Sequence, residues 1–526
     1  MTISQRKKLP IGIQTFREIR EKNHYYVDKT QMALDLVNEA KHFFLSRPRR
    51  FGKSLFLDTL KELFEGNESL FKGLAVYDHW DWSIRYPVIR FSFGGGEYTT
   101  PDELKKSIIE QLDDLDKAFD HHTTHTTLSG RFKALMRHIH KQCSLQVVVL
   151  VDEYDKPILD ALQHPEVARS NRDVLRGFYG TVKDNEAHVR FSFFTGVSKF
   201  AKVSIFSGLN NLTDISLDHR YSTLCGYTDN DIDSTFAPEL SGFDRDEIRR
   251  WYNGYNWLGD GVYNPFDILQ LFNKREFQNY WFETGTPTFL VNWLVKHQVA
   301  TPKLGNLISS SDWISSFDVE NMNTQALLFQ TGYLTIKARK RLGGQTYYTL
   351  GYPNQEVFQS LNESLLSVLV NNEDDRSQNT VALVELLLIN DFDGLKQLFH
   401  SFFTSIPHQW YTNNTIQTYE GYYSSVFYSY FASLGLDLTV EDSTNLGRID
   451  MTLKFNEQVY IFEFKVVELV PEGKALQQIK DKAYADKYQG LGQTIHLIGV
   501  EFSKDSRNIV GFEVARQTLT NFNGPL

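Results

Sequence analysis

The stretch from His42 to Leu60 constrains the fold of this chain more than any other. It begins with the apolar run Phe43 to Leu45, continues through the basic turn Arg47-Pro-Arg-Arg-Phe51, and reaches Gly52-Lys53-Ser54, after which leucines recur at helical spacing. This order predicts a short buried strand, a tight turn and a helix. Glycine lets the main chain approach a phosphate, lysine reaches the terminal phosphates, and serine ligates Mg²⁺ at a helix N-terminus. The stretch therefore predicts a phosphate-binding loop.

One residue departs from the general pattern of such loops. The pattern G-x-x-x-x-G-K-[ST] requires glycine at position 47, where this chain has Arg47. Because Gly-Lys-Ser tripeptides also begin ordinary helices, the loop alone leaves a nucleotide site and a plain helix start equally open.

A second acidic feature favours the nucleotide site. Residues Leu145 to Val151 form the most strand-like run of the chain, and Asp152 and Glu153 follow it directly. Asp152 at the end of a buried parallel strand can complete a magnesium shell, and Glu153 can polarise an attacking water. An exposed acidic turn is the alternative. With a Gly-Lys-Ser turn upstream in the same region, nucleotide binding outweighs it.

The surrounding residues alternate between strand and helix signals. Val88 to Phe93 and Val189 to Phe194 read as strands, and Leu104 to Leu115 keeps a helical period, which is the βαβ rhythm of a parallel sheet. Thr195 and Ser198 follow the last strand. They suit either a sensor of the terminal phosphate or a cap of the turn, and both interpretations stay open.

Composition excludes some classes of protein. The net charge of −10 over 526 residues excludes a globally basic nucleic-acid coat, but a nuclease with a local basic channel remains compatible with it. Cys143 and Cys225 are too few for a disulfide framework, which predicts a reducing cytoplasm. The chain lacks a run long enough to span a bilayer and a signal-peptide pattern, so we expect no membrane association.

The middle of the chain reads as helical. Asp244 and Glu247 predict a capped helix that stops near Gly254, and we expect a helical domain packed on the nucleotide site. The polar run Asn371 to Asn379 predicts a surface loop or a hinge. The histidine-rich stretch His121 to Thr127 is expected to be a surface loop rather than a metal site, because no further ligands lie at metal spacing.

A second chemical constellation lies near the C-terminus. Asp450 and the pair Glu463 and Lys465 lie on either side of the turn signal Asn456-Glu457, which predicts a β-hairpin. Residues two apart share a face of a strand, so Glu463 and Lys465 converge. Asp450 and Glu463 can ligate Mg²⁺, and Lys465 can position a water and offset developing charge. A solvated amphipathic hairpin is the alternative, but the large apolar residues around Glu463 favour a strand inside a sheet.

The helix predicted after this hairpin carries further polar residues. Gln478 and Lys482 lie one turn apart, which suits contact with a phosphate backbone. A solvated lysine-rich face accounts for the lysines equally well.

With both constellations in view, the chain resembles bacterial AAA-ATPase-like proteins that carry a C-terminal PD-(D/E)XK nuclease domain. The likeness covers nearly the whole length, and the Arg47 departure is usual in that family. It rests on Leu9-Pro-Ile-Gly12, Tyr25-Tyr-Val-Asp-Lys-Thr30, Arg47 to Ser54, Asp152-Glu-Tyr-Asp155, Thr195-Gly-Val-Ser-Lys-Phe200, Thr284-Gly-Thr-Pro287, Gly351-Tyr-Pro-Asn354, Tyr419-Glu-Gly421 and the series Asp450, Glu463-Phe-Lys465 and Gln478.

The resemblance implies a role for each matching residue. Lys53 and Ser54 would bind ATP and magnesium, with Asp152 at the metal and Glu153 at the hydrolytic water. In the nuclease domain, Asp450 and Glu463 would ligate the metal and Lys465 would assist catalysis. Glu420 and Gln478 would complete that site. The arginine that completes the ATPase site is not identified by the sequence; Arg49 and Arg50 are candidates within the same chain.

We therefore predict an α/β protein of three domains: a P-loop NTPase domain with a parallel sheet at 1–220, a helical middle domain at 221–400, and a restriction-endonuclease-like nuclease domain at 401–526. The expected cofactors are ATP and Mg²⁺, with Mn²⁺ as a substitute. The expected partner is nucleic acid, DNA in preference to RNA, and a homo-oligomer stays open.

The functional hypothesis is an ATP-regulated, Mg²⁺-dependent nuclease of bacterial defence or mobile-element conflict. The role in defence or conflict is an analogy with nucleotide-switch ATPases of bacterial conflict systems, and it rests on domain order alone. One alternative is a nucleotide-gated nucleic-acid-binding or signalling protein with an inactive nuclease fold. A plain ATPase motor is a further one, but the sequence offers no helicase motif.

Overall fold

The structure is a computed structural model that divides into two compact units. The first comprises residues 1–285 and 307–354, and the second comprises 286–306 and 355–526. The residues described are 6–199, 205–206, 209, 211–283, 290–291, 293–294, 297, 299, 301–310, 323–369, 373–405, 416–491 and 493–517. Within those ranges, no helix combines the length and the apolarity needed to cross a bilayer.

A five-stranded parallel sheet forms the centre of the first unit. Its order is β2-β3-β4-β1-β5. All residues of β1 and β3 are buried, as expected for strands covered on both faces. The parallel sheet confirms the α/β expectation. The strands are β1 (His42–Ser46), β2 (Val88–Ser92), β3 (Val147–Asp152), β4 (Val189–Gly196) and β5 (Thr213–Asp214).

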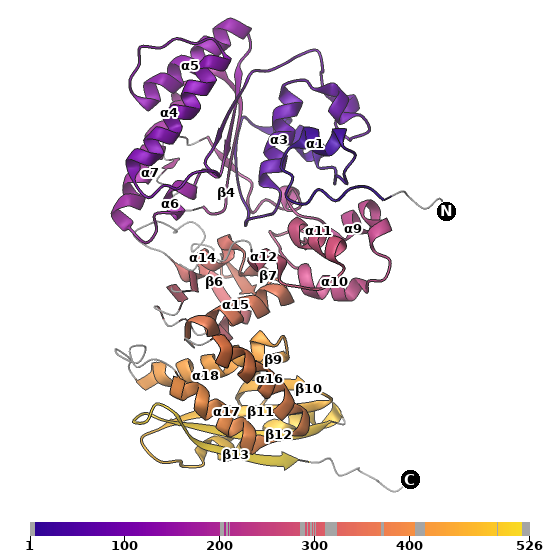
Figure 1. Ribbon diagram of the computed structural model, residues 1–526, viewed down its shortest axis with the longest axis vertical. Coiled ribbons are helices and arrows are strands. Elements are labelled where there is room, and N and C mark those ends of the chain that lie inside the picture. Colours follow the sequence, from indigo (N-terminus) through magenta and orange to yellow (C-terminus); the bar gives the residue numbers. More distant parts are fainter. Residues whose placement is uncertain are drawn as a thin grey trace. The chain divides into compact units, whose positions relative to one another are not determined.

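Helices cover both faces of this sheet (Figure 1), with α1 and α3 on one side and α4, α5 and α7 on the other. The loop between α4 and α5 carries the histidine-rich stretch, where His121 Nδ1 lies 2.7 Å from Asp116 Oδ1 and His122 and His125 are exposed. The helices are α1 (Phe16–Glu21), α2 (Thr30–Glu39), α3 (Lys53–Phe64), α4 (Pro101–Ala118), α5 (Leu128–Cys143), α6 (Lys156–Leu159) and α7 (Pro165–Asp184).

The remainder of the first unit is mainly helical, as expected, but it also contains an antiparallel sheet of order β6-β8-β7 that we did not predict. The helices are α9 (Asp229–Thr235), α10 (Arg245–Tyr252), α11 (Pro265–Lys274), α12 (Tyr280–Glu283) and α14 (Thr324–Thr331). The strands are β6 (Leu307–Ser310), β7 (Thr335–Leu342) and β8 (Gln345–Gly351). Asp244 caps α10 by accepting a hydrogen bond from Asp246 N.

The second unit contains a mixed sheet of order β13-β12-β11-β10-β9, in which only the β11–β12 pairing is parallel. Its strands are β9 (Asp437–Ser443), β10 (Arg448–Phe455), β11 (Gln458–Val467), β12 (Thr494–Ser503) and β13 (Ile509–Gln517). Its helices are α15 (Gln355–Leu369), α16 (Glu373–Ile389), α17 (Phe392–Ser405), α18 (Ile416–Ser433) and α19 (Lys474–Asp481).

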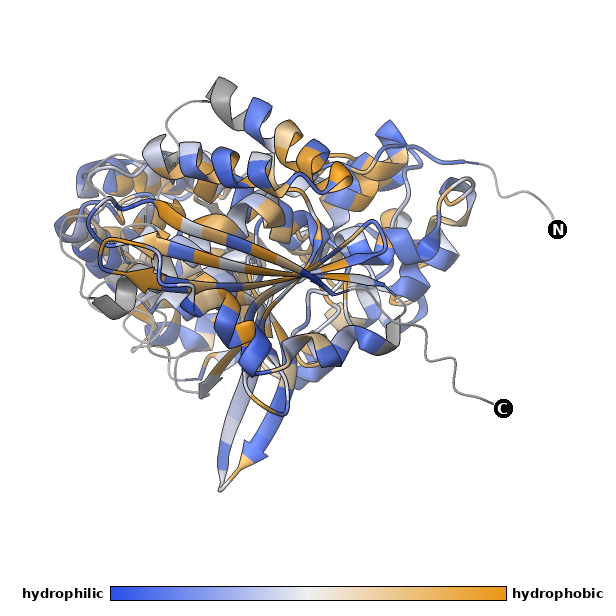
Figure 2. Ribbon diagram, turned by 90° about the horizontal axis from the view of Figure 1, so that it is seen from below, coloured by the Kyte–Doolittle hydropathy of each residue, from blue (hydrophilic) through white to orange (hydrophobic). Residues whose placement is uncertain are grey.

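Aromatic side chains of α17 and α18 pack on β11 and form the core of this unit. Phe427 contacts both Phe462 and Phe464, with ring centroids 5.5 and 5.1 Å apart. Figure 2 shows orange interrupted by white and blue along the strands, as expected where buried apolar residues alternate with polar ones. The segment expected to be a loop or hinge at 371–379 is a helix from Glu373 onward, where α16 begins, and Asn371 and Asn372 lie outside the described residues.

Candidate functional site

The turn between β1 and α3 has the geometry of an anion site. Gly52 has φ +87°, in the left-handed region that favours glycine, and it immediately precedes the first helical residue, Lys53. No side chain caps this end of α3, so its first amide groups and the positive end of the helix dipole are suited to a phosphate.

Lys53 is held within this turn. Its side chain is buried, and its Nζ donates to the carbonyl oxygens of Arg47 at 2.9 Å and Pro48 at 2.8 Å. Burial lowers the pKa of Lys53, while the nearby carboxylates of Glu153 and Asp152 oppose that change. The Lys53 ammonium therefore donates to two neutral carbonyl oxygens of the loop, and an anionic phosphate could replace them as its acceptor.

Arg47, the residue that departs from the general loop pattern, is a buried structural residue. Its guanidinium donates to the carbonyl oxygens of Ser46 (2.9 Å), Ser216 (2.8 Å) and Tyr221 (3.1 Å), and it lies over the Trp257 ring at 4.1 Å. Burial lowers its pKa to about 10, so the group stays charged at neutral pH. Arg47 therefore ties the loop to two distant segments of the first unit.

The carboxylate pair lies at the end of β3. Asp152 is buried and accepts a hydrogen bond of 2.7 Å from Thr195 Oγ1, and its Oδ2 lies 3.8 Å from Arg90 Nη2. Glu153 has φ +54°, an unusual conformation for a side-chain-bearing residue. Burial raises the pKa of Glu153, and Lys53 counteracts this. A Cβ on Gly94 would lie 3.3 Å from Glu153 Oε2, so glycine leaves room for that carboxylate.

A pocket of about 510 Å³ joins these elements, which is within the range of small-molecule sites. It brings together six of the sequence-predicted residues: Arg49, Arg50, Gly52, Lys53, Ser54 and Glu153. Asp152 and Thr195 form a pair at the adjoining strand ends. Ser198 instead donates its hydroxyl to the buried Asp155 at 2.6 Å, so the structure places it in a separate polar cluster.

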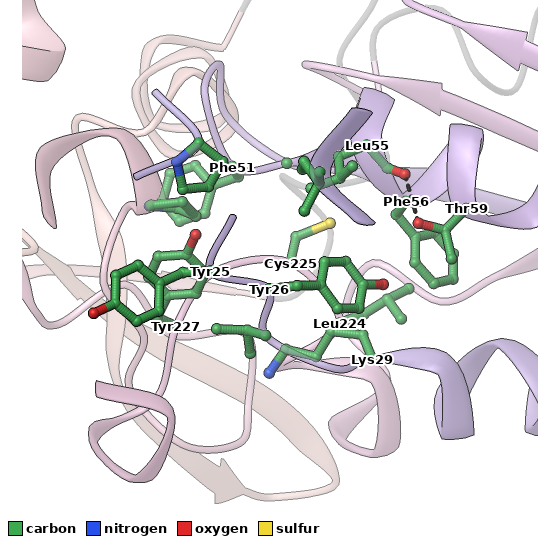
Figure 3. A pocket seen from close by; sticks show the side chains of 16 residues that line it. Tyr25, Tyr26, Lys29, Phe51, Leu55, Phe56, Thr59, Leu224, Cys225 and Tyr227 are labelled. Atoms are coloured by element: carbon green, nitrogen blue, oxygen red, sulfur yellow. Dashed lines mark hydrogen bonds between the residues drawn. The ribbon is translucent and has the colours of Figure 1, made fainter. Parts of the chain in front are cut away.

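The N-terminal segment also lines this pocket, through Pro10, Gly12, Ile13 and Gln14. Reasoning from residue chemistry missed this segment, because none of these side chains is ionisable; the motif Leu9-Pro-Ile-Gly12 was its only signal. A smaller adjoining pocket of about 70 Å³ shares Gly52 and Leu55. Figure 3 shows Phe51 and Leu55 across this smaller pocket from Tyr25, Tyr26 and Tyr227.

The second constellation converges on the β10–β11 hairpin. Asp450 Oδ2 accepts a hydrogen bond of 2.9 Å from Phe464 N, which joins β10 to the strand that carries Glu463. Glu463 Oε1 accepts from Lys465 Nζ at 3.1 Å and from Gln478 Nε2 of α19. The structure therefore brings Asp450, Glu463, Lys465 and Gln478 together. Glu420 belongs to α18, but its side chain lies outside the described residues, as do Phe200 and Thr284 to Pro287.

The electrostatics of this cluster fit a divalent cation. Glu463 is 1% exposed, and burial together with the Asp450 carboxylate raises its pKa to about 7. Burial also raises the pKa of Asp450. Glu463 Oε2 is buried without a hydrogen-bond partner among the described residues. A buried carboxylate oxygen that lacks a donor and lies beside a second carboxylate is suited to a hard cation.

The cluster supplies two carboxylates. Among the described residues there is no group of three or more histidine, cysteine, aspartate or glutamate side chains placed to hold a metal. Two carboxylates still fit Mg²⁺, which usually retains several waters and binds through one or two carboxylates together with a phosphate oxygen of its substrate.

Comparisons with known proteins match both of the domains that carry these clusters. The family model described as "Predicted AAA-ATPase" matches residues 10–206, and the model of the PD-(D/E)XK nuclease superfamily matches residues 418–512. A protein of Azotobacter chroococcum mcd 1, described as an uncharacterized protein in the vnfD 5′ region, is 60% identical over 510 residues, which cover 97% of this chain and 99% of that protein. The chain therefore belongs to the family of AAA-ATPase-like proteins that carry a C-terminal domain of the PD-(D/E)XK nuclease superfamily.

Proposed function

We propose that this protein is an ATP-regulated, Mg²⁺-dependent nuclease that cleaves phosphodiesters of DNA. The observation that carries the proposal is the partnerless Oε2 of the buried Glu463 beside Asp450, Lys465 and Gln478 among the described residues. Buried acceptors of a structural ion pair are normally satisfied, so a partnerless carboxylate oxygen beside a second carboxylate favours a cation site.

In the nuclease domain each residue has a distinct task. Asp450 and Glu463 would hold the cation, which would supply charge to polarise the phosphodiester and to make an attacking water more acidic. Lys465 Nζ, 3.1 Å from Glu463 Oε1, is placed to orient that water and to offset charge developing on the phosphate. Gln478 orients the Glu463 carboxylate by donating to Oε1, which would leave Oε2 for the cation.

In the nucleotide domain the loop binds ATP. The amide groups at the start of α3 and the Lys53 ammonium receive the phosphates, and Ser54 and Asp152 hold the accompanying Mg²⁺. Glu153 lines the same pocket and is assigned to the hydrolytic water. Arg49 and Arg50 also line it, and they are the candidates to offset the charge of the terminal phosphate.

In this proposal residues 1–220 sense the nucleotide, 221–400 relay its state, and 401–526 cut. The chain passes between the two compact units at residues 285–286, 306–307 and 354–355. A change in the first unit would therefore act on the second through three covalent connections. We place the protein in the bacterial cytoplasm and in defence or mobile-element conflict, by analogy with other proteins of this domain order.

The test is cleavage of supercoiled plasmid and of single strands with Mg²⁺ or Mn²⁺, with and without ATP. Wild type, Lys53→Ala and Glu463→Ala are compared. We expect Glu463→Ala to lose cleavage, and we expect ATP to change the wild-type rate but not that of Lys53→Ala. ATP binding without cleavage under any of these conditions would contradict the nuclease and favour a nucleotide-gated binding or signalling protein.

A further inference from the structure

A cluster of cations lies near the tip of the β7–β8 hairpin. Arg339, Lys340 and Arg341 are consecutive and exposed. No Asp or Glu occurs between Thr335 and Gly351, and none of the three cations forms an ion pair in the part of the chain that the structure describes. The chain as a whole carries a net charge of −10, so this basic hairpin, residues 335–351, is a local reversal of charge.

The register of the hairpin distributes the charges over both of its faces. Arg339 pairs with Tyr348, Lys340 with Tyr347 and Arg341 with Thr346. Because successive side chains of a strand alternate, the two arginines share one face and the lysine lies on the other. Gly343 and Gly344, with φ +55° and +87°, close the turn beyond them. Strand β6 pairs with β8 as far as Ser310 opposite Tyr347. Arg339 and Lys340 therefore lie on the edge strand of a three-stranded sheet, and Arg341 lies on the two-stranded tip beyond β6.

The base of the hairpin is fixed to the first unit. Thr335 Oγ1 accepts a hydrogen bond of 2.7 Å from Asn256 N, and Ile336 is buried. Lys337 lies at a register irregularity between Ile336 and Ala338, and its Nζ donates to the carbonyl oxygen of Pro353 at 3.2 Å. The hairpin thus has an anchored base, while residues 338–345 are exposed. Because the β7–β8 pairing already holds the main chain of this arm, binding would order its side chains but little of its backbone.

We infer that the tip of the basic hairpin binds the phosphate backbone of duplex DNA. Arginine forms bidentate hydrogen bonds with phosphate, and neutralising several phosphates releases counterions. The two-stranded tip that carries Arg341 fits the B-DNA major groove, about 12 Å wide, and leaves Arg339 and Lys340 at the sheet edge beside it for the flanking phosphates. The major groove of duplex RNA is too deep and narrow for such a tip. The choice of nucleic acid as the occupant rests on the proposed function, because a nuclease requires a surface that holds its substrate.

Protection of a sheet edge and attachment to a membrane both fit the basic hairpin less well. Edge strands such as β7 often carry lysine to prevent pairing with another sheet, but that purpose does not require three consecutive cations with two arginines on one face. An anionic membrane surface would require an apolar face as well as charge. The described part of this sheet exposes two large apolar side chains, Leu342 (51% exposed) and Ile308 of β6 (70% exposed), which is too few for an apolar face.

The test is DNA binding by the full-length chain, with Asp450→Ala in every protein so that the substrate stays intact. The triple variant Arg339→Ala/Lys340→Ala/Arg341→Ala is compared with the matched control Lys72→Ala/Lys106→Ala/Lys141→Ala. The control removes three exposed lysines of the same unit and the same amount of charge. Fluorescence anisotropy of a labelled duplex of about 30 base pairs is followed between about 50 and 200 mM NaCl.

We expect the triple variant to bind at least about tenfold more weakly and to lower the slope of log affinity against log salt by about 3, one for each phosphate contact. The control is expected to keep the slope of the parent. Equal losses in both variants, or no binding by the parent, would overturn the inference. Vesicles of phosphatidylserine and phosphatidylcholine and a duplex RNA serve as further probes. Binding by the triple variant that is weaker for one of these probes but unchanged for duplex DNA would overturn the inference as well.

These results separate the hairpin from the nuclease. Hairpin-dependent binding by a protein that never cleaves DNA would contradict the proposed cleavage and leave the inference standing. Cleavage by wild type together with unchanged DNA binding by the triple variant would support the nuclease and overturn the inference about the hairpin. Unchanged thermal unfolding of the triple variant is expected, because the substituted side chains are exposed.

Discussion

At the scale of single residues, Arg47 shows how a departure from a motif can be structural. Its guanidinium satisfies three main-chain carbonyls and stacks on Trp257. We predict that Arg47→Gly, which completes the general loop pattern, destabilises the first unit by about 3 kcal/mol, because buried acceptors lose charged donors. Urea unfolding followed by tryptophan fluorescence measures this change.

Arg49→Ala is the control for this prediction. Arg49 is exposed and lines the nucleotide pocket, so its removal is expected to change ATP affinity while stability stays within about 0.5 kcal/mol of wild type. An Arg47→Gly protein as stable as wild type, with a normal loop, would show that the buried guanidinium is dispensable.

Glu463 gives a prediction about pH. Its pKa is raised from 4.5 to about 7 by burial and by Asp450, so between these values the folded metal-free protein holds a proton that the unfolded chain lacks. The contribution of this carboxyl group to the free energy of unfolding is fully present below about pH 4.5 and is lost as the pH rises through about 7. Glu463→Gln should therefore raise the stability of the metal-free protein at pH 8, by up to about 3 kcal/mol, and have little effect at pH 5.

Thermal unfolding in EDTA at the two pH values measures this effect, with Glu513→Gln, an exposed acid of β13, as the control. Adding Mn²⁺ at pH 8 is expected to stabilise wild type and not Glu463→Gln, because the amide provides a weaker ligand. A Glu463→Gln protein that is less stable than wild type in EDTA at pH 8 would contradict the raised pKa of Glu463.

Local pattern was enough to group Asp450, Glu463 and Lys465, but it did not give the N-terminal lining of the nucleotide pocket or the partners of Arg47. Asp450, Glu463 and Lys465 share one hairpin, whose register follows from side-chain alternation. The acceptors of Arg47 at Ser216 and Tyr221 are 169 and 174 residues away along the chain. Only the folded structure brings such segments together, so the function of that arginine could not be read from its neighbours.

At the scale of elements, helix α19 determines where Gln478 lies, and a close approach to β12 fixes this helix. A Cβ on Gly499 would lie 2.3 Å from the main-chain N of Leu476. Because this neighbour is main chain, the helix itself would have to move to make room. Glu501 of the same strand accepts hydrogen bonds from Gly473 N (3.1 Å) and Ala475 N (3.2 Å) at the start of α19. The strand therefore holds the helix by contact and by charge.

We predict that Gly499→Ala displaces α19, lowers the stability of the second unit by about 1–3 kcal/mol and weakens Mn²⁺ binding, because Gln478 no longer orients Glu463. Calorimetric titration of Mn²⁺ and thermal unfolding measure the two effects. Gly305→Ala is the control, since nothing lies within 4 Å of a Cβ built there. Mn²⁺ affinity that survives in a destabilised Gly499→Ala protein would argue against a positioning role for α19.

The two hairpins differ in how well the sequence predicted them. Asn456 and Glu457, both with positive φ, form the expected turn between β10 and β11. The Gly343-Gly344 turn is an equally strong signal of a hairpin, but the aromatic and helical character of residues 221–400 led us to expect helices there. Strand β6 adds to this sheet from a separate segment, so its pairing with β8 depends on tertiary contacts.

At the scale of the whole molecule, the chain alternates between its two compact units. Residues 286–306 belong to the second unit, whereas 307–354 belong to the first. A sequence read in order favours contiguous domains, because composition and periodicity carry no record of which core a segment joins. The proposed boundaries near 220 and 400 follow the positions of the motifs, whereas the compact units follow the contacts of the folded chain.

This division yields a prediction about ligands. Each ligand stabilises the unit that binds it by RT ln(1 + [L]/Kd), about 2.7 kcal/mol at a hundredfold excess over Kd. In calorimetry, Mn²⁺ added to the EDTA-treated protein should raise the unfolding transition of the second unit, and ATP added on top should raise that of the first. Asp450→Ala should abolish only the shift caused by Mn²⁺, and Lys53→Ala should abolish only the shift caused by ATP. If either variant abolished both shifts, the two sites would be one binding unit and the assignment of separate nucleotide and nuclease sites would be wrong.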